Sequence, residues 1–103
     1  MPRKARVPTL SHKESLILEL LVEHDQMYGL ELVAASRRGL KRGTVYVTLG
    51  RMEDKGYITS WLEDAPPRAG GLPRRIYRAT PLGRRVLTAW TEMARQLVPQ
   101  FGR

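Results

Sequence analysis

Between residues 43 and 80 the spacing of apolar side chains changes twice within a short stretch. Val45, Leu49 and Met52 follow one another at steps of four and three, the spacing of one face of a helix over about 43–55. After Gly56 the apolar residues alternate with polar ones, which is typical of a strand with Ile58 and Leu62 facing inward. This stretch is therefore expected to contain a helix followed by a strand.

A loop rich in proline and glycine follows this first strand. It occupies residues 64–73 and cannot continue a strand. Residues 74–80 are again strand-like, so the two runs predict a two-stranded hairpin with a long loop that carries positive charge.

Two further helices are expected before this unit. Ser11 and Glu14 have the spacing of a capping box, and the segment behind them is apolar on more than one side, so 11–24 is predicted to be a central helix. Helical spacing resumes over 25–39 and Gly39 ends it. The apolar face of this second helix is expected to consist of Leu30, Val33 and Ala34.

The last helix is expected to begin at Pro81, with Thr80 as its N-cap. Its apolar residues recur at steps of four, three and four, as in a coiled-coil seam, and a monomer would expose them. A second copy would cover this seam together with a spare face of the first helix. The predicted dimer-interface residues are Leu18, Val22, Val86, Trp90, Met93 and Leu97.

Three helices followed by a hairpin form a winged helix-turn-helix. The predicted fold class is therefore mostly α with a small β-hairpin, to which a C-terminal dimerisation helix is added. Residues 1–10 are expected to be a basic flexible arm, 11–80 the winged helix-turn-helix domain and 81–103 the dimerisation helix.

Charge is unevenly distributed over the 103 residues, whose net charge is +8. Residues 37–52 and 65–91 contain Arg and Lys but no acid, whereas 14–36 contain acids but no Lys or Arg. This separation predicts one positive face for a polyanion, in the first place nucleic acid. No apolar run approaches the length that spans a bilayer, so we expect no membrane association and a cytoplasmic, nucleoid-associated protein.

The helix at 43–55 has the two sides that a DNA-reading helix needs. Its apolar side would hold it to the domain, while Thr44, Val47 and Arg51 on the opposite side would face the major groove. Arg can make two hydrogen bonds to guanine, and Val can contact a thymine methyl. Phosphate contacts are expected from Lys41 and Arg42 before the helix, and backbone or minor-groove contacts from Arg68, Arg74 and Arg75 on the wing.

Catalysis and cofactor binding are not expected. His12 and His24 are the only histidines, and no cysteine is present to complete a zinc site. The glycines at 70–71 lack the Lys-Ser/Thr pair of a phosphate loop. We therefore predict a non-enzymatic protein with neither a cofactor nor a metal.

The chain resembles the PadR-like transcriptional regulators over about residues 28–87. The family pattern is Gly-Thr-x-Tyr, then Leu, then Leu-Glu-x-x-Gly-Leu-Ile, and after the wing Tyr-x-Leu-Thr-x-x-Gly-x-x-x-Leu. This chain departs from it at Met52 and Ala79, which replace leucines, and at Val47, where the family often has Pro. The matching residues are Gly43, Thr44, Tyr46, Leu49, Glu53, Gly56, Ile58, Tyr77, Thr80, Gly83 and Leu87.

This resemblance implies a homodimeric transcription factor, often a repressor, that binds a pseudo-palindromic operator in double-stranded DNA. It also implies release of DNA by a small aromatic or cationic effector in several relatives. For Tyr46 two interpretations are open, a contact to DNA or a half-buried position under the wing. For Trp90 a role that only fills the dimer seam is preferred over an effector pocket.

Two other functions are consistent with the same fold. One is a winged helix used as a protein-interaction module, and the other is a non-specific nucleic-acid binder. Neither requires an operator, so replacing Thr44 or Arg51 and competition by random duplex distinguish them from a specific DNA reader.

Overall fold

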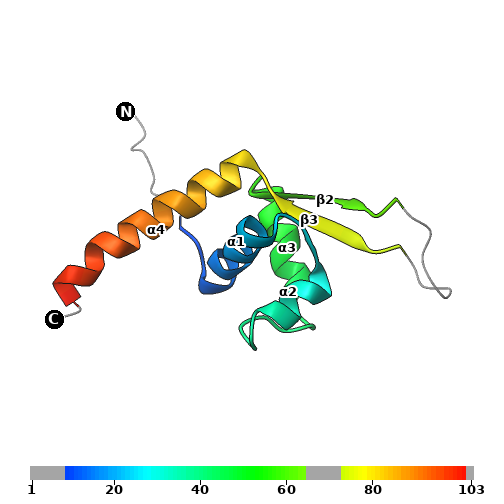
Figure 1. The fold of residues 1–103 in the computed structure, drawn as a ribbon, viewed down its shortest axis with the longest axis horizontal. Coiled ribbons are helices and arrows are strands. Elements are labelled where there is room, and N and C mark those ends of the chain that lie inside the picture. The colour runs from blue at the N-terminus through cyan, green and yellow to red at the C-terminus, as the bar shows by residue number, and fades with distance from the viewer. Residues whose placement is uncertain (1–8, 65–72, 102–103) are drawn as a thin grey trace.

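The computed structural model describes residues 9–64 and 73–101. Its first helix, α1 (His12–His24), lies in the middle of the molecule and contacts the other three helices and β3 (Figure 1). The predicted capping box is confirmed, because the amide of Glu14 donates to Ser11 Oγ at 3.1 Å and the amide of Ser11 donates to Glu14 Oε1 at 2.9 Å. Leu18 and Leu21 are completely buried on this helix.

The sheet has three strands rather than the predicted two. A short strand, β1 (Met27–Tyr28), pairs antiparallel with β3 (Arg75–Ala79), which also pairs with β2 (Ile58–Leu62). The prediction of a helix from residue 25 was therefore wrong at its start. Asp25 has φ 71°, which ends α1 and directs Met27 and Tyr28 along the free edge of β3.

The second helix, α2 (Gly29–Ala35), faces the core differently from the prediction. Leu32 is completely buried, whereas Leu30 is 47% exposed and Ala34 is also exposed. The helix begins at Gly29 rather than at residue 25, and a different set of residues faces the core. Gly29, Leu32 and Ser36 are buried at positions that share one helical face.

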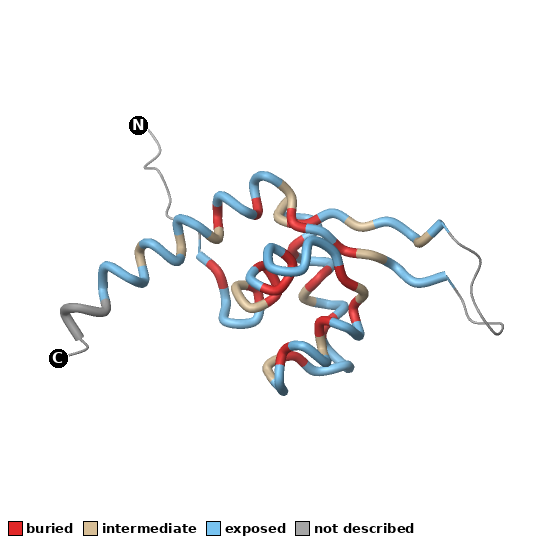
Figure 2. The backbone as a smooth tube through the Cα atoms, viewed as in Figure 1, coloured by how far each residue is buried: buried red, intermediate tan, exposed pale blue. Residues whose placement is uncertain are grey.

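The third helix, α3 (Val45–Asp54), ends before Gly56, whose φ of 82° turns the chain into β2. Ile58 in this strand is buried, but Leu62 is 54% exposed, so the prediction that both face inward was half wrong. Both residues lie on the same face of the strand, and Leu62 lies opposite Arg75 at the outer end of the hairpin. The core no longer reaches that far (Figure 2).

The fourth helix, α4 (Pro81–Phe101), begins as predicted and extends away from the body of the domain (Figure 1). Thr80 Oγ1 accepts a hydrogen bond from the amide of Gly83 at 3.0 Å, which confirms it as the N-cap. The same hydroxyl donates to the carbonyl of Gly56 at 2.6 Å and so ties the start of α4 to the end of α3.

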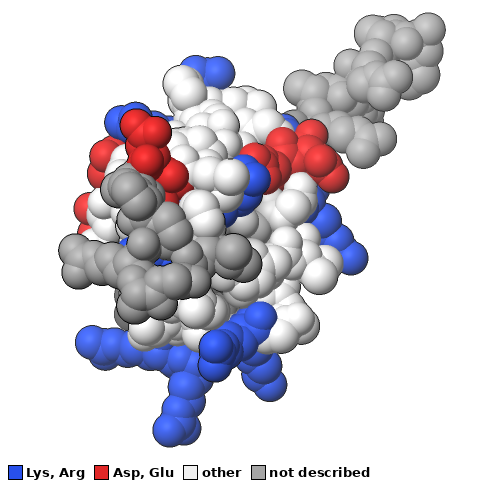
Figure 3. Space-filling model, turned by 90° about the vertical axis from the view of Figure 1, so that its right-hand side faces the viewer, with Lys and Arg blue, Asp and Glu red and all other residues white. Residues whose placement is uncertain are grey.

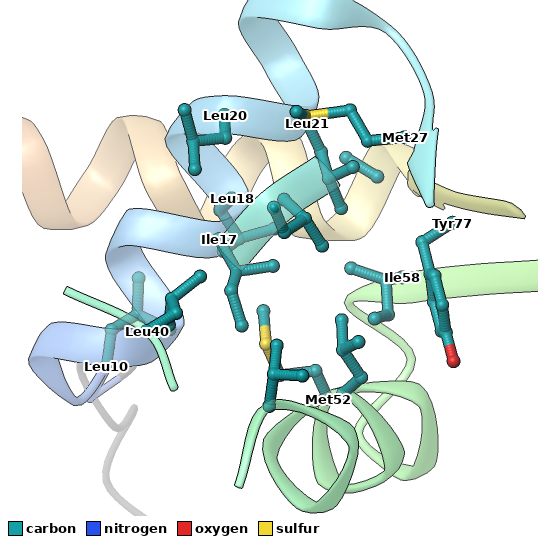
Figure 4. Close-up of a cluster of buried hydrophobic side chains, with 14 of the residues drawn as sticks. Leu10, Ile17, Leu18, Leu20, Leu21, Met27, Leu40, Met52, Ile58 and Tyr77 are labelled. Atoms are coloured by element: carbon teal, nitrogen blue, oxygen red, sulfur yellow. The ribbon is translucent and has the colours of Figure 1, made fainter. Parts of the chain in front are cut away.

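One apolar core joins these elements, with the side chains of α1, α3 and the sheet converging on it (Figure 4). Leu10 belongs to this core and is only 3% exposed, so the predicted arm cannot extend through residue 10. Residues 1–8 lie outside the described part. Within the described ranges, no helix is both long and apolar enough to cross a membrane.

Candidate nucleic-acid interface

Helix α3 has one side inside the domain and the other in solvent. Val45, Leu49 and Met52 are at most 1% exposed. On the opposite side the residues are exposed, and they are Thr44, Val47, Gly50 and Arg51. The division of this helix expected from its sequence is therefore confirmed. Its outer side lies in solvent, as the outer side of a helix that enters a major groove must.

Thr44 lies at the N-cap of α3, with φ −125° and ψ −9°. Its side chain makes no capping hydrogen bond to the helix, although threonine often serves that purpose. The hydroxyl is therefore exposed at the start of α3 and available to a partner. The helix start is instead fixed by its backbone, since the amide of Val45 donates to the carbonyl of Lys41 at 2.9 Å.

Tyr46 is half exposed, and its ring packs against the start of α2. A Cβ atom on Gly29 would lie 2.6 Å from Tyr46 Cε1 and 2.6 Å from the hydroxyl, so only glycine leaves room for the ring there. Tyr46 also borders a cleft of about 530 Å³ between α2 and the base of the wing. A contact from its hydroxyl to DNA remains a prediction.

A second hollow lies on the other side of α3, next to the start of α1. It measures about 530 Å³, and its lining includes Lys13, Thr44, Val47 and Arg51. Glu14 and Lys55 also line it and form an ion pair, in which Lys55 Nζ donates to Glu14 Oε2 at 2.7 Å. Burial tends to raise the pKa of Glu14, but the hydrogen bonds from Lys55 and Ser11 outweigh it and the pKa is lowered. The ionised pair joins α1 to the end of α3.

At the base of the wing, Arg74 is bound to its own protein. Its amide donates to Glu63 Oε1 at 3.0 Å and its Nε donates to the same oxygen at 3.3 Å. The guanidinium also lies 4.0 Å from the centre of the Tyr28 ring. The hydrogen bond from the Arg74 amide is the main cause that lowers the pKa of Glu63. Arg74 thus already has a carboxylate partner, and its predicted contact to the backbone or minor groove of DNA stays a prediction.

Arg75 is the freer cation of the two. It donates to Ser60 Oγ at 3.1 Å but has no carboxylate within ion-pair distance among the described residues. It lies on the face of the hairpin that also carries the buried Tyr77, which is the face that packs toward α3. Arg68 falls within residues 65–72, outside the described ranges.

The cations of the molecule divide by whether a carboxylate neutralises them. Five have an acidic partner, and they are Lys55, Arg74, Arg78, Arg84 and Arg95. In the described part of the chain, six cations of the turn before α3, of its outer side and of the wing have none, and they are Arg37, Arg38, Lys41, Arg42, Arg51 and Arg75. Lys and Arg side chains gather at the lower end of the molecule in Figure 3. Figures 1 and 3 share the same vertical axis, and α2 and the turn after it lie at this height in Figure 1. Their positive charge is therefore available to an external anion.

Arg37 and Arg38 were not predicted as site residues. They belong to the same acid-free run that contains Lys41 and Arg42, so the charge pattern alone could have indicated them. What the sequence did not indicate is their backbone, which is left-handed at both residues, with φ 53° and 75°.

The predicted dimer surface needs correction. Leu18 is completely buried and Val86 is 5% exposed, so both pack inside the protomer and cannot meet a second copy directly. Their side chains fill the contact between α1 and α4. Among the other predicted interface residues, Val22 is 37% exposed and Leu97 is 46% exposed.

Trp90 and Met93 lie on α4 between Val86 and Leu97 and are partly buried. Trp90 packs against the core. The outer half of α4 is largely exposed (Figure 2). Among the described residues, no group of three His, Cys, Asp or Glu side chains is placed to hold a metal ion.

Three comparisons with known proteins are consistent with this geometry. A model of the transcriptional regulator PadR-like family matches residues 17–89. The chain is 42% identical over 69 residues to the transcriptional regulator Rv3488 of Mycobacterium tuberculosis, and the match covers 61% of each protein. The chain therefore spans less than two thirds of that relative's length.

Solved structures of similar fold belong to regulators as well. A PadR family transcription regulator from hypervirulent Clostridium difficile R20291 superimposes with a TM-score of 0.72 at 28% identity, over 90% of this chain and all of the other. A PadR family transcriptional regulator from Eggerthella lenta has the same TM-score and identity, over 86% of this chain and 77% of its own.

Proposed function

Because the chain belongs to the transcriptional regulator PadR-like family, we propose that it binds specific double-stranded DNA as a homodimer and represses transcription from the cytoplasm, on the nucleoid. The observation that carries this proposal is the two-sided helix α3. Its inner side is held by Val45, Leu49 and Met52, and its outer side is exposed and acid-free through Arg51.

The outer side of α3 provides the contacts that read sequence. Arg51 can donate two hydrogen bonds to a guanine, and Val47, which is 56% exposed, can cover a thymine methyl. The hydroxyl of Thr44 and that of Tyr46 supply further polar contacts at the start of the helix. Lys41, Arg42 and Arg75 contact phosphates and so fix the register of the helix on the duplex.

The partner protomer is proposed to pack along α4. Leu97 and Val22 are large apolar side chains on the surface, and α4 extends beyond the domain that it leaves. A second copy placed on this surface removes the exposed apolar area and pairs two recognition helices about one or two turns of DNA apart. Such a dimer requires a pseudo-palindromic operator.

Occupation of the operator by this dimer would block access of polymerase to a promoter. Trp90 lies in the surface proposed for the dimer and packs partly against the core. We assign it first to packing and second to a site for a small aromatic or cationic effector. Quenching of Trp90 fluorescence by such a compound, coupled to release of DNA, supports the second role.

Selection of bound sequences from a random duplex pool tests the proposal. A motif with two-fold symmetry is expected, because each protomer reads one half-site. Enrichment without any motif supports a non-specific binder. No enrichment, with Thr44→Ala and Arg51→Ala variants that behave as the parent, supports a protein-interaction module.

A further inference from the structure

The turn between α2 and α3 contains two adjacent residues with left-handed backbone, Arg37 and Arg38. In the described ranges, the only other residue besides glycine with positive φ is Asp25. L-residues with a side chain as long as arginine rarely adopt this conformation, because Cβ approaches the following carbonyl oxygen. Glycine would occupy both positions without that conflict.

The residues on either side impose this shape on the turn. Ser36 is buried, and its hydroxyl donates to the carbonyl of Val33 at 2.7 Å and accepts from the amide of Leu40 at 3.0 Å. Leu40 is itself 3% exposed, and a Cβ on Gly39 would lie 2.5 Å from Leu16 Cδ2. With both ends anchored in the core, Arg37 and Arg38 have no freedom to relax.

Neither guanidinium contributes to the fold. Both residues are exposed, and in the described part of the chain neither forms an ion pair or a side-chain hydrogen bond. By contrast, Arg78 and Arg84 share Asp25 at the other turn with positive φ. Among the described residues the strain at Arg37 and Arg38 therefore has no compensating contact, and it persists where two positive charges enter solvent side by side.

We propose that Arg37 and Arg38 are a phosphate clamp for the DNA backbone. The clamp lies beside the N-terminal end of α3, where Thr44 is the N-cap. The inference rests on the proposed function, since it requires a bound duplex. A helix in the major groove has its N-terminal turn next to the phosphates that border the groove. The clamp adds affinity that is independent of sequence, and strained backbone that serves binding instead of stability is a known property of functional sites.

Glycine substitution separates the two effects of these residues. Arg37→Gly and Arg38→Gly relieve the backbone conflict, so each is expected to raise Tm by roughly 2–5 °C. Each also removes one cation per protomer. Fluorescence anisotropy with a labelled mixed-sequence duplex is expected to show affinity about eightfold lower per lost contact at 0.1 M salt.

The salt dependence provides the second readout. The slope of log affinity against log salt is expected to fall by about 0.9 for each lost contact. Arg37→Lys and Arg38→Lys keep both the charge and the strain, so they should match the parent in Tm and in slope. Arg85→Ala removes from α4 an exposed arginine that has no carboxylate partner among the described residues, and it should leave the slope unchanged.

The outcomes are distinct. A parent protein that does not bind any duplex refutes the proposed function itself. If the parent binds and the glycine variants keep its affinity and slope, the clamp is refuted while the proposed function stands. Glycine variants that lower Tm refute the assignment of strain, and lysine variants as weak as the glycine variants refute the role of charge.

Discussion

Replacing Gly83 with alanine adds one methyl group where α4 leaves the wing. The added Cβ would lie 2.0 Å from the carbonyl oxygen of Tyr57, well inside the 3.4 Å at which ordinary contact begins, and 3.2 Å from Leu18 Cδ2, just inside it. The oxygen cannot move away freely, because it accepts a hydrogen bond from the amide of Thr80 at 3.0 Å. Helix α4 must therefore shift as a whole.

The expected destabilisation is about 2–3 kcal/mol, the range for overpacking against atoms that cannot relax. Tm is expected to fall by roughly 10–20 °C, because 1 kcal/mol shifts Tm by about 4–8 °C in a domain of this size. Thermal unfolding followed by circular dichroism measures the shift. Because α4 carries the proposed dimer surface, sedimentation should also show weaker association.

Gly50 offers a matched control, since it is the same residue type within a helix but nothing lies within 4 Å of an added Cβ. Gly50→Ala is expected to stabilise the protein by about 0.5–1 kcal/mol through helix propensity alone. A clash at Gly83 is refuted if Gly83→Ala unfolds at the temperature of the parent, or if both substitutions shift Tm in the same direction. Loss of DNA affinity in Gly50→Ala would mean that DNA closely approaches this exposed position.

Four further substitutions test other parts of the structure. Met52→Ala removes a completely buried side chain from the inner side of α3, and chemical denaturation should show a loss of about 2–5 kcal/mol. Glu14→Gln breaks the ion pair with Lys55 and should cost about 1 kcal/mol near neutral pH, because Lys55 is partly exposed. Since the folded-state pKa of Glu14 is lowered, this difference should be present above the usual pKa of a glutamate and disappear as the pH falls below it; a difference that grows in acid would contradict the assignment. Arg51→Ala should relax selectivity at one base pair of the operator by about 1–3 kcal/mol, measured against all four bases at each position, and a uniform loss over all sequences would make Arg51 a phosphate contact. Leu97→Arg places a charge on the exposed part of α4 and should produce monomers in ultracentrifugation with an unchanged Tm of the domain, whereas an unaltered dimer would move the interface elsewhere.

Much of the candidate site could be predicted because its signals are local. The step between Val45, Leu49 and Met52 defines one face of α3 regardless of what that face contacts. The outer residues Thr44 and Arg51 then follow by exclusion. The cap residues Ser11 and Thr80 bond to amides three residues away, so their roles depend on the immediate sequence alone.

Other features depend on partners far along the chain. The pairing of Arg74 with Glu63 and Tyr28 requires β1 to lie beside β3. Strand β1 has only two residues, which is too short for an alternating pattern that would predict a strand from the sequence. The burial of Leu18 and Val86 within one protomer was likewise missed. An apolar stripe on a helix has the same appearance in sequence whether its own domain or a second copy covers it.

The sequence by itself determined the order of the four helices and of the β2–β3 hairpin, the capped starts of α1 and α4, the anchored side of α3 and the separation of positive from negative charge. These follow from side-chain period, turn chemistry and composition, which act over a few residues. Only the tertiary structure decided which arginines are neutralised, which face of α2 is buried and where the backbone at Arg37 and Arg38 is strained. Each of those depends on distances between segments that the chain brings together only when it folds.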